Sequence, residues 1–207
     1  LGDLDMATHL RRTELLAGGA SLSEATAAIA SSLGVAHAIV PMTDDPVRTV
    51  AVTDEGELAF QAYFVKRGCE PRIRSVRFDG CDAARPSPGF IAAIRSADAI
   101  VFCPSNPIVS IGPVLALPGV QDAIKTFTGP RIAVSPIVGG RALNGPAAKM
   151  MAELGEEVNS VGVARRLMGV CDTLVVDTED AADAGKIEAL GMHAVVTGTV
   201  MVGDADK

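Results

Sequence analysis

The sequence has very few aromatic residues and no long apolar run. Tryptophan is absent and tyrosine occurs once, although 48% of the 207 residues are apolar. A core built from this chain therefore consists mainly of Ala, Val, Ile and Leu. Small branched side chains of this kind suit strands that are buried on both faces and covered by helices. The length is sufficient for one large domain, or for one domain with a small satellite.

Positive charge is also scarce. The 18 Lys and Arg residues are outnumbered by 25 Asp and Glu residues, which gives a net charge of −7. The sequence therefore lacks the domain-wide basic footprint of a nucleic-acid-binding protein. An acidic protein that binds a phosphate group has to use local donors or a metal ion, because its overall field repels the ligand.

Paired cysteines and targeting segments are missing as well. Cys69, Cys81, Cys103 and Cys171 are far apart and form no CxxC pair, so neither a disulfide framework nor a zinc site is indicated. No apolar run approaches the ~20 residues that span a bilayer, and no signal peptide is recognisable. We therefore expect reduced thiols, a cytoplasmic location and no membrane partner. The chain opens at Leu1 without Met, which indicates a truncated start.

Two helices are expected first. Residues 4–17 carry apolar side chains near helical spacing and end at Gly18-Gly19. Ser21 or Ser23 is expected to cap a second helix that runs to about Leu33. Two helices joined by Gly-Gly are compatible with a DNA-binding helix-turn-helix. A plain helical hairpin is favoured, because no basic recognition helix follows.

An antiparallel region is expected next. The segment Asp54-Glu55-Gly56 has the composition of a hairpin turn. Strand-like segments cover residues 38–40, 48–53, 58–65 and 72–78. We therefore assign residues 1–87 to a helical hairpin followed by an antiparallel β region.

From residue 88 onward, helices and strands alternate. Short apolar strands are expected at residues 99–103, 131–134, 173–176 and 193–196, and helices at residues 90–97, 114–126 (interrupted near Pro118-Gly119), 146–154, 160–168 and 181–190. This alternation implies right-handed βαβ crossovers and a parallel sheet. The predicted fold class is α/β: a Rossmann-like, mostly parallel sheet with helices on both faces, plus a small helical and antiparallel β insertion. Residues 88–207 form the parallel part of one continuous fold that lacks its first βα units.

The first of two candidate binding loops covers residues 104–112 and reads Pro-Ser-Asn-Pro-Ile-Val-Ser-Ile-Gly. It lies after a strand and before a helix, where backbone N–H groups and a helix dipole meet an anion. Ser105, Asn106 and Ser110 add neutral donors, and the prolines stiffen the loop. A helix cap with turn-forming residues explains this loop equally well.

The second candidate loop, residues 135–145, follows the next strand. Gly139 and Gly140 permit positive φ and a close backbone approach to a ligand. Arg141 is placed to pair with a phosphate or carboxylate, and Lys149 lies one turn into the next helix. No Gly-Lys-Ser/Thr occurs, so this is not a Walker A loop, and an ordinary βα loop is the alternative. Because ligands bind beyond the carboxyl ends of parallel strands, we expect the two loops to share one cleft.

Two acidic pairs are candidates for holding Mg²⁺, an ion that keeps several waters and uses few protein ligands. The pairs are Asp3 with Asp5 and Asp44 with Asp45. Capping is the favoured interpretation of both: Asp3 or Asp5 starts the first helix, and Asp44 starts a turn before Pro46.

Four segments, in this order and spacing, form a specific pattern over nearly the whole chain. They are residues 1–13 (Leu-Gly-Asp-Leu-Asp-Met-Ala-Thr-His-Leu-Arg-Arg-Thr), 60–65 (Phe-Gln-Ala-Tyr-Phe-Val), 104–113 (Pro-Ser-Asn-Pro-Ile-Val-Ser-Ile-Gly-Pro) and 135–140 (Ser-Pro-Ile-Val-Gly-Gly). The pattern resembles the 2-phospho-L-lactate transferase / phosphoenolpyruvate transferase family of coenzyme F-420 biosynthesis. Members of that family begin well upstream, so the resemblance implies an N-terminally truncated chain whose expected metal ligands lie in the missing region.

The resemblance implies a transferase. Such enzymes join a 2-phospholactyl or phosphoenolpyruvyl group, from its guanosine diphosphate ester, to the deazaflavin Fo; GMP leaves, and F-420-0 or dehydro-F-420-0 forms with Mg²⁺. We also expect a homodimer. The resemblance assigns no individual catalytic residue. Its implied substrate-binding residues are Ser105, Asn106, Pro107, Ser110, Gly112, Ser135, Gly139, Gly140, Asp3, Asp5 and Thr8.

Two other functions stay open. A non-catalytic sugar-nucleotide-binding regulator of a related family shares the sheet and a similar loop, although Ser-Asn-Pro followed by Ser-Ile-Gly-Pro favours the transferase branch. A DNA-binding regulator would use the first helical hairpin. The acidic charge disfavours it and predicts no binding to duplex DNA.

Overall fold

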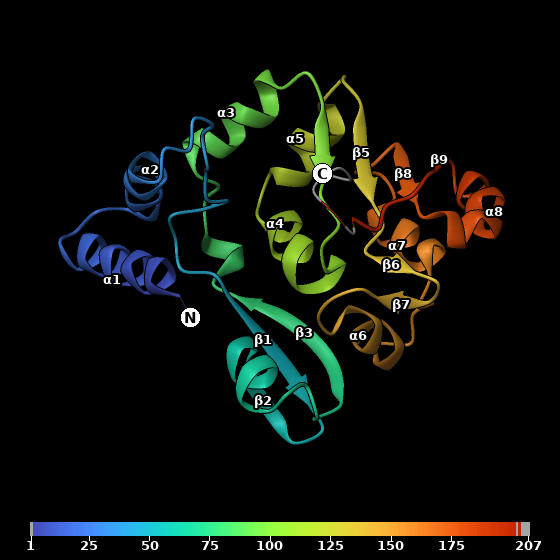
Figure 1. Cartoon of the computed structure of the whole chain (residues 1–207), viewed down its shortest axis with the longest axis horizontal. Coiled ribbons are helices and arrows are strands. Elements are labelled where there is room, and N and C mark those ends of the chain that lie inside the picture. The colour runs from blue at the N-terminus through green and yellow to red at the C-terminus, as the bar shows by residue number, and fades with distance from the viewer. Residues whose placement is uncertain (1, 202, 204–207) are drawn as a thin grey trace.

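The computed structural model describes residues 2–201 and 203; Leu1, the first residue of the opening motif, and residues 202 and 204–207 lie outside the described part. A parallel sheet forms its centre (Figure 1). The strand order is β4-β5-β8-β9, and each strand pairs with the next one in this order. Their bounds are β4 (Ile100–Phe102), β5 (Arg131–Val134), β8 (Thr173–Val176) and β9 (His193–Val196). All four strands of the predicted sheet are thereby confirmed.

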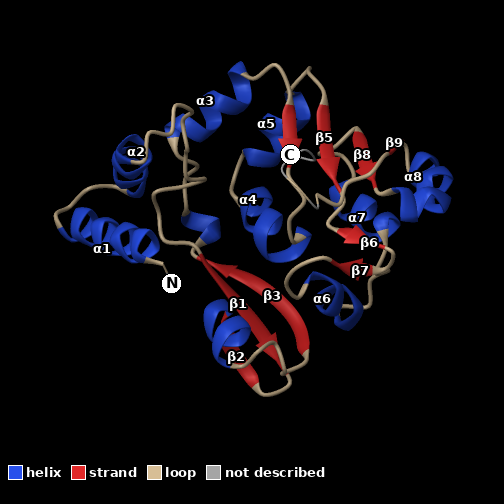
Figure 2. Ribbon diagram, viewed as in Figure 1, coloured by secondary structure: helices blue, strands red, loops and turns tan. Residues whose placement is uncertain are grey.

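Helices connect these strands in the predicted α/β manner (Figure 2). The expected break at Pro118-Gly119 is present, where Gly119 takes φ +78°. The helical run Pro107–Ala116 and the helix after it meet there at a bend of 88°, and among the described residues no single helix is long and apolar enough to cross a membrane. The helices are α3 (Pro88–Ser96), α4 (Gly112–Ala116), α5 (Val120–Thr126), α6 (Ala147–Glu153), α7 (Ser160–Leu167) and α8 (Ala184–Ala189), with a π-helical segment at Pro107–Ile111 and a 3-10 segment at Thr178–Asp183.

The core lies under the two inner strands. Ala133 of β5 and Leu174 of β8 are fully buried, whereas Val101 on the edge strand β4 is 58% exposed. The small apolar side chains of these strands pack against Leu117, Met150 and Leu167 from the surrounding helices, all within one continuous cluster. This is the aromatic-poor core that the composition predicts.

The N-terminal helices form a hairpin, as expected. α1 (Asp3–Ala17) and α2 (Leu22–Ser32) pack side by side, and the Ser21 hydroxyl accepts a hydrogen bond from the Glu24 amide at 3.2 Å to cap α2. The strand expected at residues 38–40 is wrong: the segment has no strand partner and forms a largely exposed connection. Apolar composition alone cannot make a strand where no neighbouring backbone is available to pair with it.

A separate antiparallel sheet follows, in the order β2-β1-β3. Its strands are β1 (Arg48–Thr53), β2 (Gly56–Ala59) and β3 (Ile73–Asp79), with a 3-10 segment at Cys81–Ala83. The predicted hairpin turn is confirmed, because Thr53 pairs with Gly56 across Asp54-Glu55. The strand predicted for residues 58–65 is wrong beyond Ala59: a π-helical segment, Ala62–Lys66, takes its place.

Candidate functional site

The parallel register sends four chain segments out at one edge of the sheet. Phe102 pairs with Ala133, Val134 with Val175, and Val176 with Val196. The loops after β4, β5 and β8 and the tail after β9 therefore start side by side, which is the position where open parallel sheets bind ligands.

A cleft of about 550 Å³ opens at this edge. Both predicted loops line it, so the expected shared cleft is present. Its lining residues are Phe60, Phe64, Pro104, Ser105, Asn106, Val109, Ser110, Ser135, Pro136, Leu143, Asn144, Gly145, Pro146, Ala147, Thr199 and Met201.

The loop after β4 is shaped by Asn106. Its Oδ1 atom accepts hydrogen bonds from the Ile108 and Val109 amides at 2.9 and 3.3 Å, which caps the π-helical segment Pro107–Ile111. Its Nδ2 atom donates a long contact to Met150 Sδ at 3.5 Å. Asn106 thus holds the turn and lines the cleft, while Pro107 is buried beneath it. Gly112 begins α4 and lies against Phe78, outside the cleft lining.

The loop after β5 turns back on itself as a small hairpin of β6 (Ile137–Val138) and β7 (Arg141–Ala142). Ser135, which is buried, fixes the bend: its hydroxyl donates to the Ile137 carbonyl at 2.9 Å and accepts from the Ile137 amide at 3.2 Å. Gly139 and Gly140 form the hairpin turn with φ +56° and +72°, which confirms the predicted positive φ.

These two glycines lie outside the cleft lining. The Gly139 amide donates to the Asp180 carboxylate at 3.1 and 3.2 Å, so it is already occupied. Burial raises the pKa of Asp180 above its ordinary value, and the Gly139 hydrogen bond opposes that shift. In this conformation Gly139 orients the second loop through Asp180 and does not face the cavity.

The tail after β9 forms a further wall that the sequence did not indicate. Asp177, at the end of β8, accepts hydrogen bonds through Oδ2 from the Thr199 amide at 2.7 Å and hydroxyl at 3.1 Å. Its Oδ1 atom accepts from the Glu179 amide at 3.0 Å. These donors, with the Thr199 amide the largest contributor, lower the pKa of Asp177 from 3.8 to about 2. The carboxylate thereby holds Thr199, which lines the cleft together with Met201.

An aromatic wall closes the cleft from the antiparallel region. Phe60 and Phe64 stack with ring centroids 5.8 Å apart and planes 3° from parallel. Both residues belong to the family pattern but not to the predicted site residues. The sequence does contain a signal for their grouping: Phe60, Tyr63 and Phe64 follow the i, i+3, i+4 spacing that places side chains on one face of a helix.

The cleft wall carries no charged residue within the described part of the chain. Arg141 is exposed and lies 4.0 Å from Glu179, and Lys149 is engaged with Glu153 at 2.6 Å, so neither faces the cavity. In the described chain, the hydroxyls of Ser105 and Ser110 and the backbone amides of residues 105, 106, 144 and 145 have no hydrogen-bond acceptor. Residues with free neutral donors from both loops therefore line the cleft.

The acidic residues of the opening motif are elsewhere. Asp3, Asp5 and Thr8 lie on α1, which packs on α2 at the far left of the view in Figure 1. Asp5 accepts from the Gly2 amide at 3.1 Å, and the Thr8 hydroxyl donates to the Leu4 carbonyl at 2.8 Å.

The second acidic pair is also used within the fold. Asp44 accepts from the Ser23 amide and hydroxyl at 2.6 and 3.0 Å, and Asp45 accepts from the Arg85 amide at 2.8 Å. No group of three or more His, Cys, Asp or Glu residues in the described part is placed to hold a metal ion. The residues at hand therefore do not form a site for Mg²⁺.

Comparison with known proteins identifies the family. The model of the family "2-phospho-L-lactate transferase CofD" matches residues 1–197. The chain belongs to the CofD family. It is 41% identical over 201 residues to a 2-phospho-L-lactate transferase of Methanosarcina mazei, covering 97% of this chain and 66% of that protein. It is 42% identical over 198 residues to a phosphoenolpyruvate transferase of Streptomyces griseus, covering 93% of this chain and 62% of that protein.

This CofD-family chain thus spans slightly less than two thirds of the length of these relatives. Its fold also matches a crystal structure of a UPF0052-family protein from Bacillus halodurans, with a TM-score of 0.64 and 18% identity over 93% of this chain and 65% of that one. The family confirms the predicted resemblance, and the structural match confirms the α/β fold class.

Removing the Asn106 cap should loosen the first loop. We expect Asn106→Ala to lower the free energy of unfolding by about 1 kcal/mol, because two amides lose their acceptor. Asn106→Asp keeps an oxygen acceptor and should recover most of this. Ser105→Ala, whose hydroxyl makes no hydrogen bond in the described chain, should stay within about 0.5 kcal/mol of the parent. Urea unfolding measures all three; a Ser105→Ala loss equal to that of Asn106→Ala would contradict the assignment.

Protonation of Asp177 should release the tail. Its pKa is lowered on folding, so the stabilisation is fully present above the ordinary value of 3.8 and is lost as the pH falls through about 2. The unfolding free energies of the parent and Asp177→Asn should therefore differ by a constant amount well above pH 3.8. The difference should shrink as the pH falls from 3.8 toward about 2. Thr199→Ala, which removes only the hydroxyl contact, should show part of the same difference. Urea unfolding across this pH range tests the sign, since a gap that widens toward acid is the opposite result.

Proposed function

We propose that the full-length protein joins a 2-phospholactyl or phosphoenolpyruvyl group, from its guanosine diphosphate ester, to the deazaflavin Fo. GMP leaves, and F-420-0 or dehydro-F-420-0 forms. Family membership and the names of two groups of relatives, 2-phospho-L-lactate transferases and phosphoenolpyruvate transferases, support this. Because this chain spans only part of their length, the activity is assigned to the whole protein.

The observation that carries the proposal is the shared cleft of uncharged donors. A diphosphate ester brings several negative oxygens into a protein of net charge −7. Amide and hydroxyl groups pointing into one cavity can hold such oxygens without a charged partner, as anion-binding loops do. The free amides of residues 105, 106, 144 and 145, with the Ser105 and Ser110 hydroxyls, belong to residues of both loops that line the same cleft.

The reaction needs positioning more than a protein nucleophile. A hydroxyl oxygen of Fo would form a bond to the phosphorus that is esterified to the three-carbon acid. The bond from that phosphorus to the bridging oxygen breaks, GMP departs with this oxygen, and the hydroxyl proton passes to solvent. The donors of the two loops would stabilise the negative charge on the transferred group. The described residues offer no cluster for Mg²⁺, so its requirement stays a prediction for the full-length protein.

The Phe60–Phe64 pair is assigned to the ring of a substrate. Phe64 is 41% exposed although it is large and apolar, and Leu143 and Met201 are similarly exposed on the same cleft. Apolar side chains that converge on a cavity beside polar donors suit a ligand with a flat ring and a polar arm. Fo has this character, as does the guanosine of the donor.

The assay for this function uses the full-length protein with Fo, Mg²⁺ and each guanosine diphosphate ester in turn. Formation of F-420-0 or its dehydro form, with one GMP per product, is the expected result. Absence of product with both donors would refute the proposal. Calorimetry with UDP-sugars tests the regulator alternative: tight binding of a UDP-sugar without any response to Fo would establish it instead.

Truncating Phe64 should weaken ring binding. We expect Phe64→Ala in the full-length protein to raise the Kd for Fo about tenfold, equivalent to ~1.4 kcal/mol, because the stacked wall loses half of its surface. Val65→Ala is the matched control, since Val65 is the next residue, is 70% exposed and is not part of the cleft lining. Calorimetric titration with Fo measures both. Equal effects of the two variants would place the ring elsewhere.

A further inference from the structure

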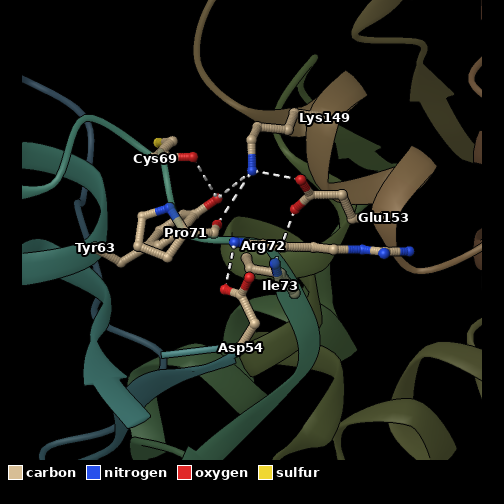
Figure 3. Close-up of polar contacts among 8 residues, drawn as sticks. All are labelled: Asp54, Tyr63, Cys69, Pro71, Arg72, Ile73, Lys149 and Glu153. Carbon is tan, nitrogen blue, oxygen red and sulfur yellow. Dashed lines mark hydrogen bonds and ion pairs between the residues drawn. The ribbon is translucent and has the colours of Figure 1, made fainter. Parts of the chain in front are cut away.

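A polar cluster joins the antiparallel region to the parallel sheet just behind the aromatic wall. Figure 3 shows Lys149 and Glu153 of α6 facing the chain that leads into β3. Lys149 Nζ donates to Glu153 Oε1 at 2.6 Å, to the Pro71 carbonyl at 3.2 Å and to the Tyr63 hydroxyl at 3.5 Å. An ammonium group has three donors, and all three are used here.

The cluster also binds backbone atoms of residues 71–73, the segment that leads into β3. Glu153 Oε2 accepts from the Ile73 amide at 2.9 Å, so the carboxylate binds Lys149 with one oxygen and β3 with the other. Asp54, in the turn after β1, holds the same segment, because it accepts from the Arg72 amide at 2.9 Å and its own amide donates to the Arg72 carbonyl at 3.0 Å. Residues 71–73 are therefore hydrogen-bonded both to α6 and to the turn after β1.

Tyr63 connects this cluster to the cleft. It is fully buried, and its hydroxyl donates to the Cys69 carbonyl at 3.4 Å while accepting from Lys149. It lies between Phe60 and Phe64 in sequence, and its ring is 6.2 Å from that of Phe60. Lys149 Nζ also lies 5.9 Å from the Tyr63 ring centroid. Tyr63 therefore contacts Phe60 directly and Phe64 through the stacked Phe60 ring.

We propose that Lys149 and Glu153 are positioning residues, which clamp the antiparallel region onto α6 and thereby hold the Phe60–Phe64 wall at the cleft. The pair touches no lining group of the cavity, so it acts through Tyr63 and β3. The structural part of this inference is independent of the proposed function, and only its kinetic consequence rests on it. A clamped wall matters for binding, because a wall already held in place loses less conformational entropy when the ligand binds.

The structural test uses this chain, in which Tyr63 is the single tyrosine and tryptophan is absent, so every tyrosine signal reports on the clamp. Lys149→Met should speed hydrogen exchange in residues 60–66 and 71–73 about tenfold, while β5 and β8 keep their protection. Lys149→Arg, which keeps the charge and the donors, should restore most of the protection. Lys186→Met is the control, since it breaks a comparable pair with Asp183 (3.0 Å) on α8.

Tyrosinate absorbance gives a second readout. Burial raises the pKa of Tyr63, Lys149 lowers it, and the neighbouring Cys69 and Glu153 raise it. Removing the ammonium group should therefore move the titration to higher pH in Lys149→Met and leave it in place in Lys186→Met. Unchanged exchange in residues 60–66, or equal acceleration there and in β5 and β8, would overturn the clamp in favour of no role or of a general stabilising role.

The kinetic test uses the full-length protein. Lys149→Met should raise KM for Fo roughly tenfold and leave kcat within about twofold, because the wall contacts the ring and not the reacting phosphorus. A loosened region with an unchanged KM would overturn the positioning role while leaving the transferase intact. A protein without transferase activity whose exchange and titration respond as expected would refute the proposed function and support the clamp.

Discussion

The in-register parallel pairing of β4, β5, β8 and β9 is the constraint on which the rest of this structure depends. Phe102, Ala133 and Leu174 lie level across the sheet, so every strand exit falls at one edge. The hydrogen bonds of the ladder bring together a loop after residue 102, a hairpin after residue 134 and a tail after residue 196. A slip in this register would separate the walls of the cleft, even if each loop kept its own turn.

Each of the three segments that leave the parallel sheet is then fixed by one side chain that binds backbone amides. Asn106 caps the first loop, Ser135 bends the second, and Asp177 holds the tail through Thr199. On the side of the aromatic wall, Lys149 donates to the Pro71 carbonyl and Glu153 accepts from the Ile73 amide. None of the described residues that line the cleft is charged, so an anion bound there, as proposed, would rely on neutral donors, which do not carry the cost of burying unpaired charge. Such a cleft in an acidic protein would select an anionic ligand by geometry, because the long-range field gives no attraction.

Local sequence predicted most of the helices and the strands of the parallel sheet, because apolar periodicity and Gly/Pro punctuation act over short distances. The prediction from local sequence was wrong where contacts with residues distant in the chain decide the secondary structure. Residues 38–40 have strand composition but no strand to pair with, and residues 60–66 carry β-forming residues but place Phe60, Tyr63 and Phe64 on one helical face. Tertiary partners also decide the role of Lys149. A cation one turn into a helix suits a phosphate, but the Lys149 ammonium group is already bound to Glu153 and to the Pro71 carbonyl.

By itself the sequence determined the fold class, the two loops, the positive φ of Gly139 and Gly140 and the family, since each is written in contiguous residues or in their order. Only the tertiary structure decided which of these groups meet. It brought Phe60 and Phe64 to the loops of the parallel sheet, turned the Gly139 amide toward Asp180, and left Asp3, Asp5 and Thr8 on a distant helix. The physical reason is that a hydrogen bond or a packed ring between residues far apart in the chain depends on where the whole backbone places them, and no local pattern encodes that position.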